Sequence, residues 1–349
     1  MLFRSALARN EAAWLALAWV ALCWRLPLPA RERIRRVGVV AGAAIAVFLP
    51  WAARDWLVFG SPFPGQALLN ALSLDGRDIF AWQDPPTLAR YVAAGPAAWI
   101  GTRVTGFGHN LVNVLLIFGV PVSLIGLAAL PWTLRWPPAR PLAIMTGLTF
   151  ATTTLLFPVS TTWGTFLHTA GPAHVLLILS CLLALDAGIT RLGRHRGWTR
   201  PVAWLGPALA IAAGALFTVA LLPGFGQDGR QTQAKFEALR AALAALPPGE
   251  GGDGPVITDY PIWLADVVGV PALALPDESP TAVLDLAAHF PGTRLLIVDE
   301  TVGGGRWPAI VTGGLPGAAC FRAVPLPTPD ATGVGSVLEK TRMYRIDCP

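Results

Sequence analysis

Long uncharged stretches constrain this chain more than any other feature of its sequence. They cover residues 37–53, 111–134, 141–163 and 201–225. Each is about long enough to cross the hydrocarbon core of a bilayer, for which a helix needs roughly 20 apolar residues. Charged residues make up only 13% of the 349 residues, whereas soluble proteins carry about 25%. The sequence therefore predicts an integral membrane protein.

Arginine-rich connectors between the apolar stretches predict its orientation, because short loops rich in Arg and Lys face the cytoplasm. We expect a polytopic α-helical membrane protein with about six transmembrane helices, at residues 12–28, 37–53, 111–134, 141–158, 172–189 and 201–222. With the connectors inside, both termini, the loop of residues 54–110 and everything after residue 223 lie outside. The chain is thus predicted to be a multi-pass protein of the plasma membrane.

The net charge of +5 does not indicate a nucleic-acid partner, because the basic residues are spread over these connectors and accompany no recognition module. The connectors contain Arg31, Arg33, Arg35, Arg36, Arg135, Arg140, Arg191, Arg194, Arg196 and Arg200. Lysine occurs only as Lys235 and Lys340. We interpret its scarcity as a reflection of genome base composition.

The C-terminal residues 224–349 differ from the rest and predict a small exported α/β domain, after a transmembrane domain of residues 1–223. A helix over 231–246 is followed by a turn-rich region, and then strands and helices alternate, which favours a parallel or mixed sheet. We expect strands at 256–258, 272–275, 294–298, 320–324 and 342–346, and helices at 263–268 and 281–289.

The loop of residues 54–110 contains helix signals of its own. Two prolines, Pro85 and Pro86, precede Thr87, which is a suitable N-cap for a helix that starts there. A second short helix is expected at 96–104.

The four cysteines divide between the two parts of the chain. Cys23 and Cys181 lie in apolar segments and are interpreted as small buried hydrophobic residues. Cys320 and Cys348 lie in the exported domain, where an oxidising compartment permits a disulfide. The sequence leaves open whether these two pair.

Residues 49–64, which read LPWAARDWLVFGSPFP, form the most specific string. It resembles the Pro-Trp-x-x-Arg-Asn-x-x-x-Phe-Gly-x-Pro stretch of the GT-C superfamily of integral-membrane glycosyltransferases, which includes protein O-mannosyltransferases and the aminoarabinose transferases of lipid A. Asp55 stands where the family has Asn. Residues 166–172, the run Arg9-Asn10-Glu11 and the element order of the C-terminal domain also resemble these enzymes, so the resemblance covers nearly the whole chain.

This resemblance implies transfer of a sugar from a polyprenyl-phosphate carrier to an acceptor at the outer membrane face. A cationic group stabilises the leaving phosphate in such a reaction. Arg54, at the predicted outer boundary, is one candidate, since its planar fork suits phosphate oxygens. The alternative is an interfacial arginine that snorkels beside tryptophans. His168 is a second candidate, or else a residue that holds a short loop.

The family's catalytic acidic residue lies in a first external loop that has no counterpart in this chain. We therefore expect a C-terminal portion of a longer enzyme that is inactive alone. Asp75, Asp78 and Asp84 are weaker acidic candidates, with turn capping as the alternative. Gly303-Gly304-Gly305 is interpreted as a flexible loop. No cofactor is identified, and the cysteine and histidine spacing indicates no metal site.

The expected partners are the lipid bilayer, a polyprenyl-phosphate-linked sugar and the missing N-terminal half. The alternative function is a non-enzymatic membrane scaffold or transport component whose exported domain binds a partner.

Overall fold

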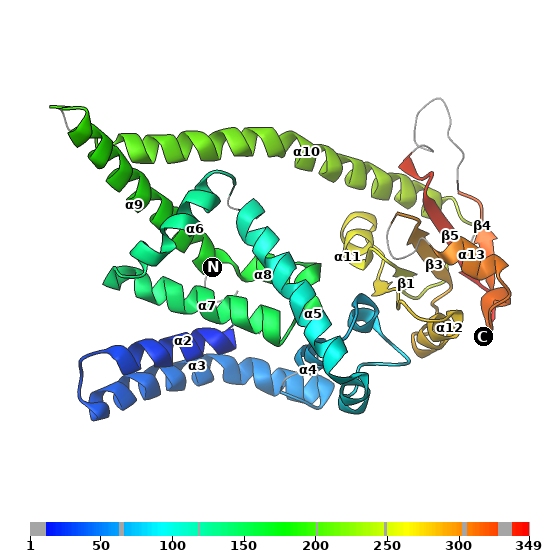
Figure 1. Ribbon diagram of the computed structural model, residues 1–349. Helices are drawn as coiled ribbons and strands as arrows, with labels where there is room; N and C mark the ends of the chain where they lie inside the picture. Colours follow the sequence, from blue (N-terminus) through cyan, green and yellow to red (C-terminus); the bar gives the residue numbers. More distant parts are fainter. Residues whose placement is uncertain are drawn as a thin grey trace. The chain divides into compact units, whose positions relative to one another are not determined.

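The protein forms two compact units (Figure 1). The computed structural model describes residues 12–62, 66–117, 119–199, 202–247, 250–301, 306–326 and 337–348, so Arg9, Asn10, Glu11 and Gly303–Gly305 lie outside the described residues. The helical unit comprises Met1–Gly76 and Pro86–Ala220. The second unit, here called the α/β domain, comprises Arg77–Pro85 and Leu221–Pro349. The second boundary lies near the expected one, but nine residues of the long loop belong to the α/β domain.

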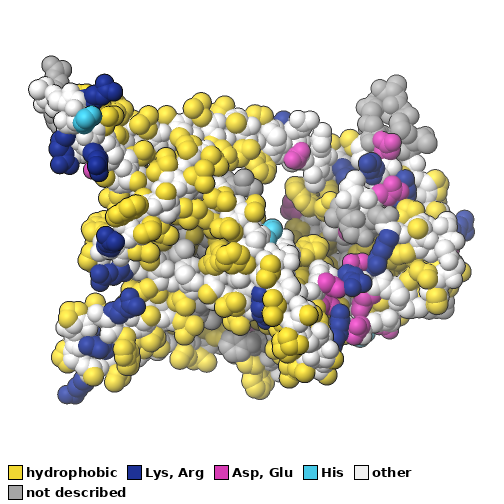
Figure 2. Space-filling model, viewed as in Figure 1, with side chains coloured by type: hydrophobic (Ala, Val, Ile, Leu, Met, Phe, Trp, Pro, Cys, Tyr) yellow, Lys and Arg dark blue, Asp and Glu magenta, His cyan; other side chains and the backbone are white. Residues whose placement is uncertain are grey.

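Three helices are long and apolar enough to cross a membrane: α3 (Ala30–Phe59), α9 (Gly171–His195) and α10 (Leu205–Ala244). Their apolar side chains are largely exposed, as at Ile45, which is 60% exposed, and Ile211, which is 72% exposed. Figure 2 shows hydrophobic side chains over most of the visible face of the helical unit. Apolar surface of this extent suits contact with lipid rather than water, so the structure supports insertion into a membrane.

The other helices of this unit are shorter or kinked. They are α2 (Ala12–Arg25), α4 (Gln66–Leu72), α5 (Leu88–Ile117), α6 (Val122–Thr133), α7 (Arg140–Leu155) and α8 (Thr165–Thr169), with short 3-10 turns at η1 (Gly76–Phe80), η2 (Pro137–Ala139) and η3 (Ser160–Trp163).

The expectation of one continuous helix over residues 111–134 is wrong. Helix α5 ends at Ile117, and α6 begins at Val122. Between them Gly119 adopts a φ of 71°, which lies outside the helical region. Pro121 also lacks the N–H that a continuing helix would use. The apolar run of residues 111–134 is therefore divided between two helices by Gly119 and Pro121.

The predicted helix start in the long loop is confirmed. The Arg90 N–H donates to Thr87 Oγ1 at 3.2 Å, which is the N-cap bond that the sequence predicts. Gly95, with φ 75° and ψ 174°, interrupts α5. The second helix expected at 96–104 is thus the first part of a longer segment that continues to Ile117.

Helices α6 and α9 pack closely through small residues. A Cβ atom on Gly126 of α6 would lie 2.5 Å from the Leu177 carbonyl oxygen of α9. The Ser180 hydroxyl donates to the Gly126 carbonyl at 2.7 Å and lies 2.8 Å from Thr133 Oγ1. Close backbone approach with cross-helix hydroxyl bonds is typical of helix pairs in membranes.

The α/β domain contains a five-stranded mixed sheet in the order β2-β1-β3-β5-β4. Strand β1 is parallel to both β2 and β3, whereas β5 runs antiparallel to β3 and β4. All five strands lie within one residue of the predicted bounds: β1 (Val256–Thr258), β2 (Ala272–Ala274), β3 (Leu295–Asp299), β4 (Phe321–Val324) and β5 (Thr341–Ile346). Its helices and turns are α11 (Pro261–Trp263), η4 (Leu264–Val268), α12 (Pro280–His289), α13 (Trp307–Thr312) and η6 (Ala318–Cys320).

Hydrophobic clusters cover both faces of this sheet. Along β3, Leu296 and Val298 join a cluster with Val283 and Leu286 of α12. The alternate residues Leu295 and Ile297 join a second cluster with Phe236 and Leu239 of α10. This is the two-residue period of a strand with both faces buried.

The second cluster depends on the unusual length of α10. The sequence suggests two helices, at 201–222 and 231–246, but the structure has one helix that runs through Pro223 to Ala244. The last turns of an apolar helix thereby become a layer of the α/β domain.

We expect Gly126→Ala to destabilise the helical unit by about 1–3 kcal/mol, because the added methyl group overpacks the contact with α9. Thermal unfolding of the detergent-solubilised protein measures this effect. The matched control is Gly188→Ala, where an added Cβ meets nothing within 4 Å. Equal melting temperatures for the two variants would contradict the close packing.

Candidate functional site

The motif that carries the family resemblance places Arg54 near the end of α3. Its Nη1–H donates to Asp55 Oδ1 at 2.9 Å, and its guanidinium carbon lies 5.0 Å from the centre of the Trp51 ring. The helix ends five residues later, where Gly60 adopts a φ of 71° and its N–H donates to the Trp56 carbonyl. Arg54 is thus a cation held at the end of an apolar, membrane-length helix.

Asp55 and Arg54 differ sharply in exposure. The Asp55 side chain is 5% exposed, and the Arg54 side chain is 55% exposed. A guanidinium carries five N–H donors, and the bond to Asp55 engages a single nitrogen. The buried carboxylate therefore binds one nitrogen of the guanidinium, while about half of the Arg54 side chain remains exposed. This arrangement is suited to binding an anionic oxygen, such as that of a phosphate.

The second phosphate candidate, His168, lies on a different part of the helical unit. It is an exposed residue of the short helix α8. Its backbone N–H donates to the Gly164 carbonyl at 3.2 Å. The main packing neighbours of α8 are η3, α7 and α5, whereas α3 packs mainly against α2. The structure therefore does not pair the helices that carry Arg54 and His168.

The three weaker acidic candidates are divided between the two units. Asp75 belongs to the helical unit, whereas Asp78 and Asp84 belong to the α/β domain. Asp78 is buried in η1, and the Asp84 N–H donates to Glu278 Oε1 at 2.7 Å. Each of the three takes part in a polar interaction within the protein.

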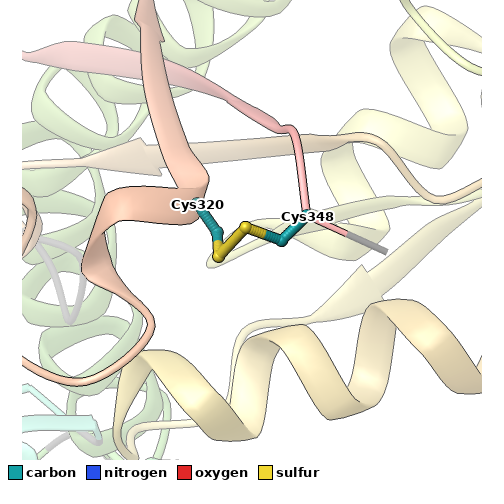
Figure 3. The surroundings of a disulfide bond; sticks show 2 residues. All are labelled: Cys320 and Cys348. Carbon is teal, nitrogen blue, oxygen red and sulfur yellow. A yellow bond between two sulfur atoms is a disulfide. The ribbon is translucent and has the colours of Figure 1, made fainter.

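The two cysteines of the α/β domain are joined by a disulfide (Figure 3). The bond links Cys320, the last residue of η6 directly before β4, to Cys348, which follows β5, over a sequence separation of 28 residues. It ties together the two strands at one edge of the sheet. Cys23 and Cys181 are free and buried, in agreement with their interpretation from sequence.

A charged cluster that the sequence analysis missed lies at the carboxyl ends of β1 and β3. Lys235, from α10, forms an ion pair with Asp299 at the end of β3, and both side chains are largely buried. The Asp299 N–H donates to Asp259 Oδ2 at 2.8 Å. Lys235 Nζ also lies 5.0 Å from the centre of the Tyr260 ring.

Hydrogen bonds inside this cluster satisfy its carboxylates. The Thr301 N–H donates to Asp299 Oδ1 at 2.7 Å. Burial raises the pKa of the Tyr260 phenol, and the neighbouring Asp259 carboxylate raises it further. Tyr260 therefore stays neutral beside the charged groups at physiological pH.

The position of this charged cluster in the sheet indicates its role. In the sheet, β2 lies on one side of β1 and β3 lies on the other side. The connections from β1 to β2 and from β2 to β3 therefore run in opposite directions, and a topological switch point lies between β1 and β3. Open α/β sheets bind ligands outside the strand ends at such points. Here Lys235 of the same chain lies there instead. We interpret the cluster as the anchor that holds α10 on the sheet.

Some signals for this cluster were present in the sequence. Asp259 and Asp299 each directly follow a predicted strand. Lys235 is one of only two lysines in the chain.

Among the residues that the structure describes, no group of three or more His, Cys, Asp or Glu side chains is arranged to hold a metal ion. Comparison of the chain with protein-family models, with curated proteins and with solved structures finds no match. A functional assignment therefore depends on the site itself.

We expect Lys235→Met to destabilise the protein by about 3–5 kcal/mol, because it leaves the buried Asp299 carboxylate without its cation. Chemical unfolding followed by circular dichroism measures the loss. Lys340→Met is the matched control, because Lys340 is exposed and surface charges contribute little. An equal, small effect of both substitutions would show that Lys235 is not an anchor.

Proposed function

We propose that this chain belongs to a membrane-embedded glycosyltransferase that uses a polyprenyl-phosphate-linked sugar, and that Arg54 binds the phosphate of the carrier. The observation that carries the proposal is the half-exposed side chain of Arg54, held by the buried Asp55 at the end of an apolar helix. The carrier has the matching chemistry, since it joins a long apolar chain to an anionic phosphate. The resemblance of residues 49–64 to the GT-C superfamily supports the same assignment.

In this proposal Arg54 acts on the leaving group of the reaction. Cleavage of the bond between sugar and phosphate leaves negative charge on the phosphate oxygens, and a preorganised cation lowers the barrier to that cleavage. Asp55 is a positioning residue for Arg54. The acceptor hydroxyl also needs a general base, and we assign that role to no described residue.

The proposal includes an orientation. The shorter helices α2, α6 and α7 supplement the three long ones to make about six crossings, the arginine-rich connectors face the cytoplasm, and the α/β domain faces outward across the plasma membrane. The Cys320–Cys348 disulfide supports this orientation, because such bonds persist outside the reducing cytoplasm.

A second candidate function is a non-enzymatic scaffold whose exported domain binds a partner. The observation that favours it is that Lys235 fills the switch point of the sheet, where other α/β domains bind a ligand, which suits a structural role better than a catalytic one for this domain. Binding of polyprenyl phosphate distinguishes the two functions, because a scaffold has no reason to bind it.

We expect Arg54→Ala to weaken binding of polyprenyl phosphate by at least about tenfold, because it removes charge-assisted hydrogen bonds worth about 1.5–3 kcal/mol. Arg54→Lys should give an intermediate loss, since an ammonium lacks the planar fork. Binding is measured on the purified chain in lipid nanodiscs. Arg31→Ala, at the other end of α3, is the control and should leave affinity unchanged. Unaltered affinity in Arg54→Ala would remove Arg54 from the site.

We expect two of the four cysteines to react with a thiol reagent when protein taken directly from cells is denatured without reductant. An exported α/β domain keeps Cys320 and Cys348 oxidised, so only Cys23 and Cys181 react. Mass spectrometry counts the labels, and a sample reduced before labelling provides the reference value of four. Four labels without reduction would contradict export of the domain.

A further inference from the structure

The α/β domain contains a cavity of about 590 Å³ that belongs to neither site described above. Its lining comes from the segment before β1, from α12 and the loop that leads to β3, and from the end of β5 with the residues that follow. Cavities of roughly 300–1,000 Å³ are the size that binds small molecules. All of this lining lies within residues 250–348 of one compact unit.

One wall of the cavity is apolar and closely packed behind its surface. Ala287 and Ala288 of α12 line it, and Pro291 follows the helix. Next to Pro291, Gly292 adopts a φ of 83°, and its carbonyl accepts the Gly254 N–H at 3.0 Å. A Cβ atom on Gly254 would clash with the backbone of Gly292. The two loops therefore fix each other, and the cavity is preformed.

The opposite wall carries a closed set of charges. Arg345 of β5 donates from Nε to Asp347 Oδ1 at 2.5 Å and from Nη2 to Asp347 Oδ2 at 3.4 Å. Its Nη1 also lies 3.3 Å from Glu250 Oε1. These bonds hold the pKa of the Asp347 carboxyl below its ordinary value, and the charges of Arg322 and Arg294 lower it further. One guanidinium is thus shared by two carboxylates.

The disulfide holds this second wall in place. Cys348 lines the cavity and is bonded to Cys320 (Figure 3). The Asp347 N–H donates to the Cys320 carbonyl at 2.9 Å. The residues after β5 are therefore fixed both covalently and by a backbone hydrogen bond.

Arg294 brings a second cation to the cavity. It is exposed, and its guanidinium forms no ion pair with the residues that the structure describes. Its backbone is held, because its carbonyl accepts the Ile346 N–H at 2.9 Å. The neighbouring Thr293 side chain is 7% exposed, and its hydroxyl has no hydrogen-bond partner in the described part of the chain. The cavity therefore borders an unpaired cation and an unused hydroxyl group.

We propose that this cavity binds an anionic sugar, either a uronate or a sugar phosphate, with its acidic group on Arg294. A guanidinium donates paired hydrogen bonds to the oxygens of both acids. Carboxylates have about four acceptor sites each, so Asp347 and Glu250 keep acceptors for sugar hydroxyls beside Arg345. The apolar face of a sugar ring packs against Ala287 and Ala288. This site goes beyond the proposed function and does not depend on Arg54.

The experiment measures the affinity of the purified full-length chain in detergent for four small molecules, by titration followed with ligand-observed NMR. Glucuronate and glucose 1-phosphate are the two anionic sugars. Glucose lacks the acidic group, and cyclohexanecarboxylate lacks the hydroxyls. The melting temperature and the count of free thiols check that each variant is folded with its disulfide formed.

Three variants are compared with the wild type. Arg294→Ala removes the unpaired cation, and Ala288→Trp fills the cavity from an exposed helical position. Arg322→Ala is the matched control. Arg322 is an exposed arginine of the same domain whose charge also acts on Asp347, but it does not line the cavity.

We expect at least one anionic sugar to bind about tenfold more tightly than glucose and cyclohexanecarboxylate, and Arg294→Ala to weaken it by about tenfold, because charge-assisted hydrogen bonds are lost. Ala288→Trp should abolish binding, since the indole occupies the space of the ring. Arg322→Ala should change affinity by less than about twofold, because a distant exposed charge contributes little. The tighter of the two sugars identifies the acidic group.

Three results would overturn this site. Glucose binding as tightly as both acids would show that no cation reads the ligand, and cyclohexanecarboxylate binding as tightly would show that hydroxyls are not recognised. Equal losses in Arg294→Ala and Arg322→Ala would reduce the effect to overall charge. Undiminished binding in Ala288→Trp would place the ligand elsewhere. Each of these results leaves the role of Arg54 untouched, because that role is tested with polyprenyl phosphate.

Discussion

The ion pair between Lys235 and Asp299 is the interaction on which the organisation of the α/β domain depends. It joins the last turns of α10 to the carboxyl end of β3, where Asp259 adds a second negative charge. Helix α10 runs from Leu205 to Ala244, and its last turns belong to the α/β domain. The hydrophobic contacts of Phe236 and Leu239 complete the layer, while the buried charges specify where on the sheet that layer lies.

Local patterns in the sequence were sufficient to predict the strands and the cap of α5. The five strands coincide with short apolar runs bounded by turn residues, and Thr87 follows two prolines. In both cases the residues adjacent in sequence are enough to predict the local structure. The same reasoning failed for residues 111–134, where hydropathy predicted one helix but Gly119 and Pro121 divide it. It also treated α10 as two helices, because a proline and several glycines near residue 224 resemble a boundary. Tertiary packing on the sheet overrides that local signal.

The candidate site was predictable only in part, for a related reason. Arg54 was recognised because its neighbours in sequence form a motif. Its partner Asp55 was noted as a departure from that motif, but not as the buried group that orients it. The hydrogen bond between Asp84 and Glu278 spans 194 residues, and no local pattern connects two such positions. Interactions of this kind become visible only when the fold brings their elements together.

The discontinuity of the α/β domain has a topological consequence. Residues 77–85 and the chain after residue 220 build one domain, so both must occupy the same side of the bilayer. The polypeptide between them must therefore cross the membrane an even number of times. Helix α9 and the apolar half of α10 are long and apolar enough to supply two such passages. Parity then requires that any passages contributed by α5, α6 and α7 come as a pair, so a topology in which a single one of these helices crosses is forbidden by the way the sheet domain is built.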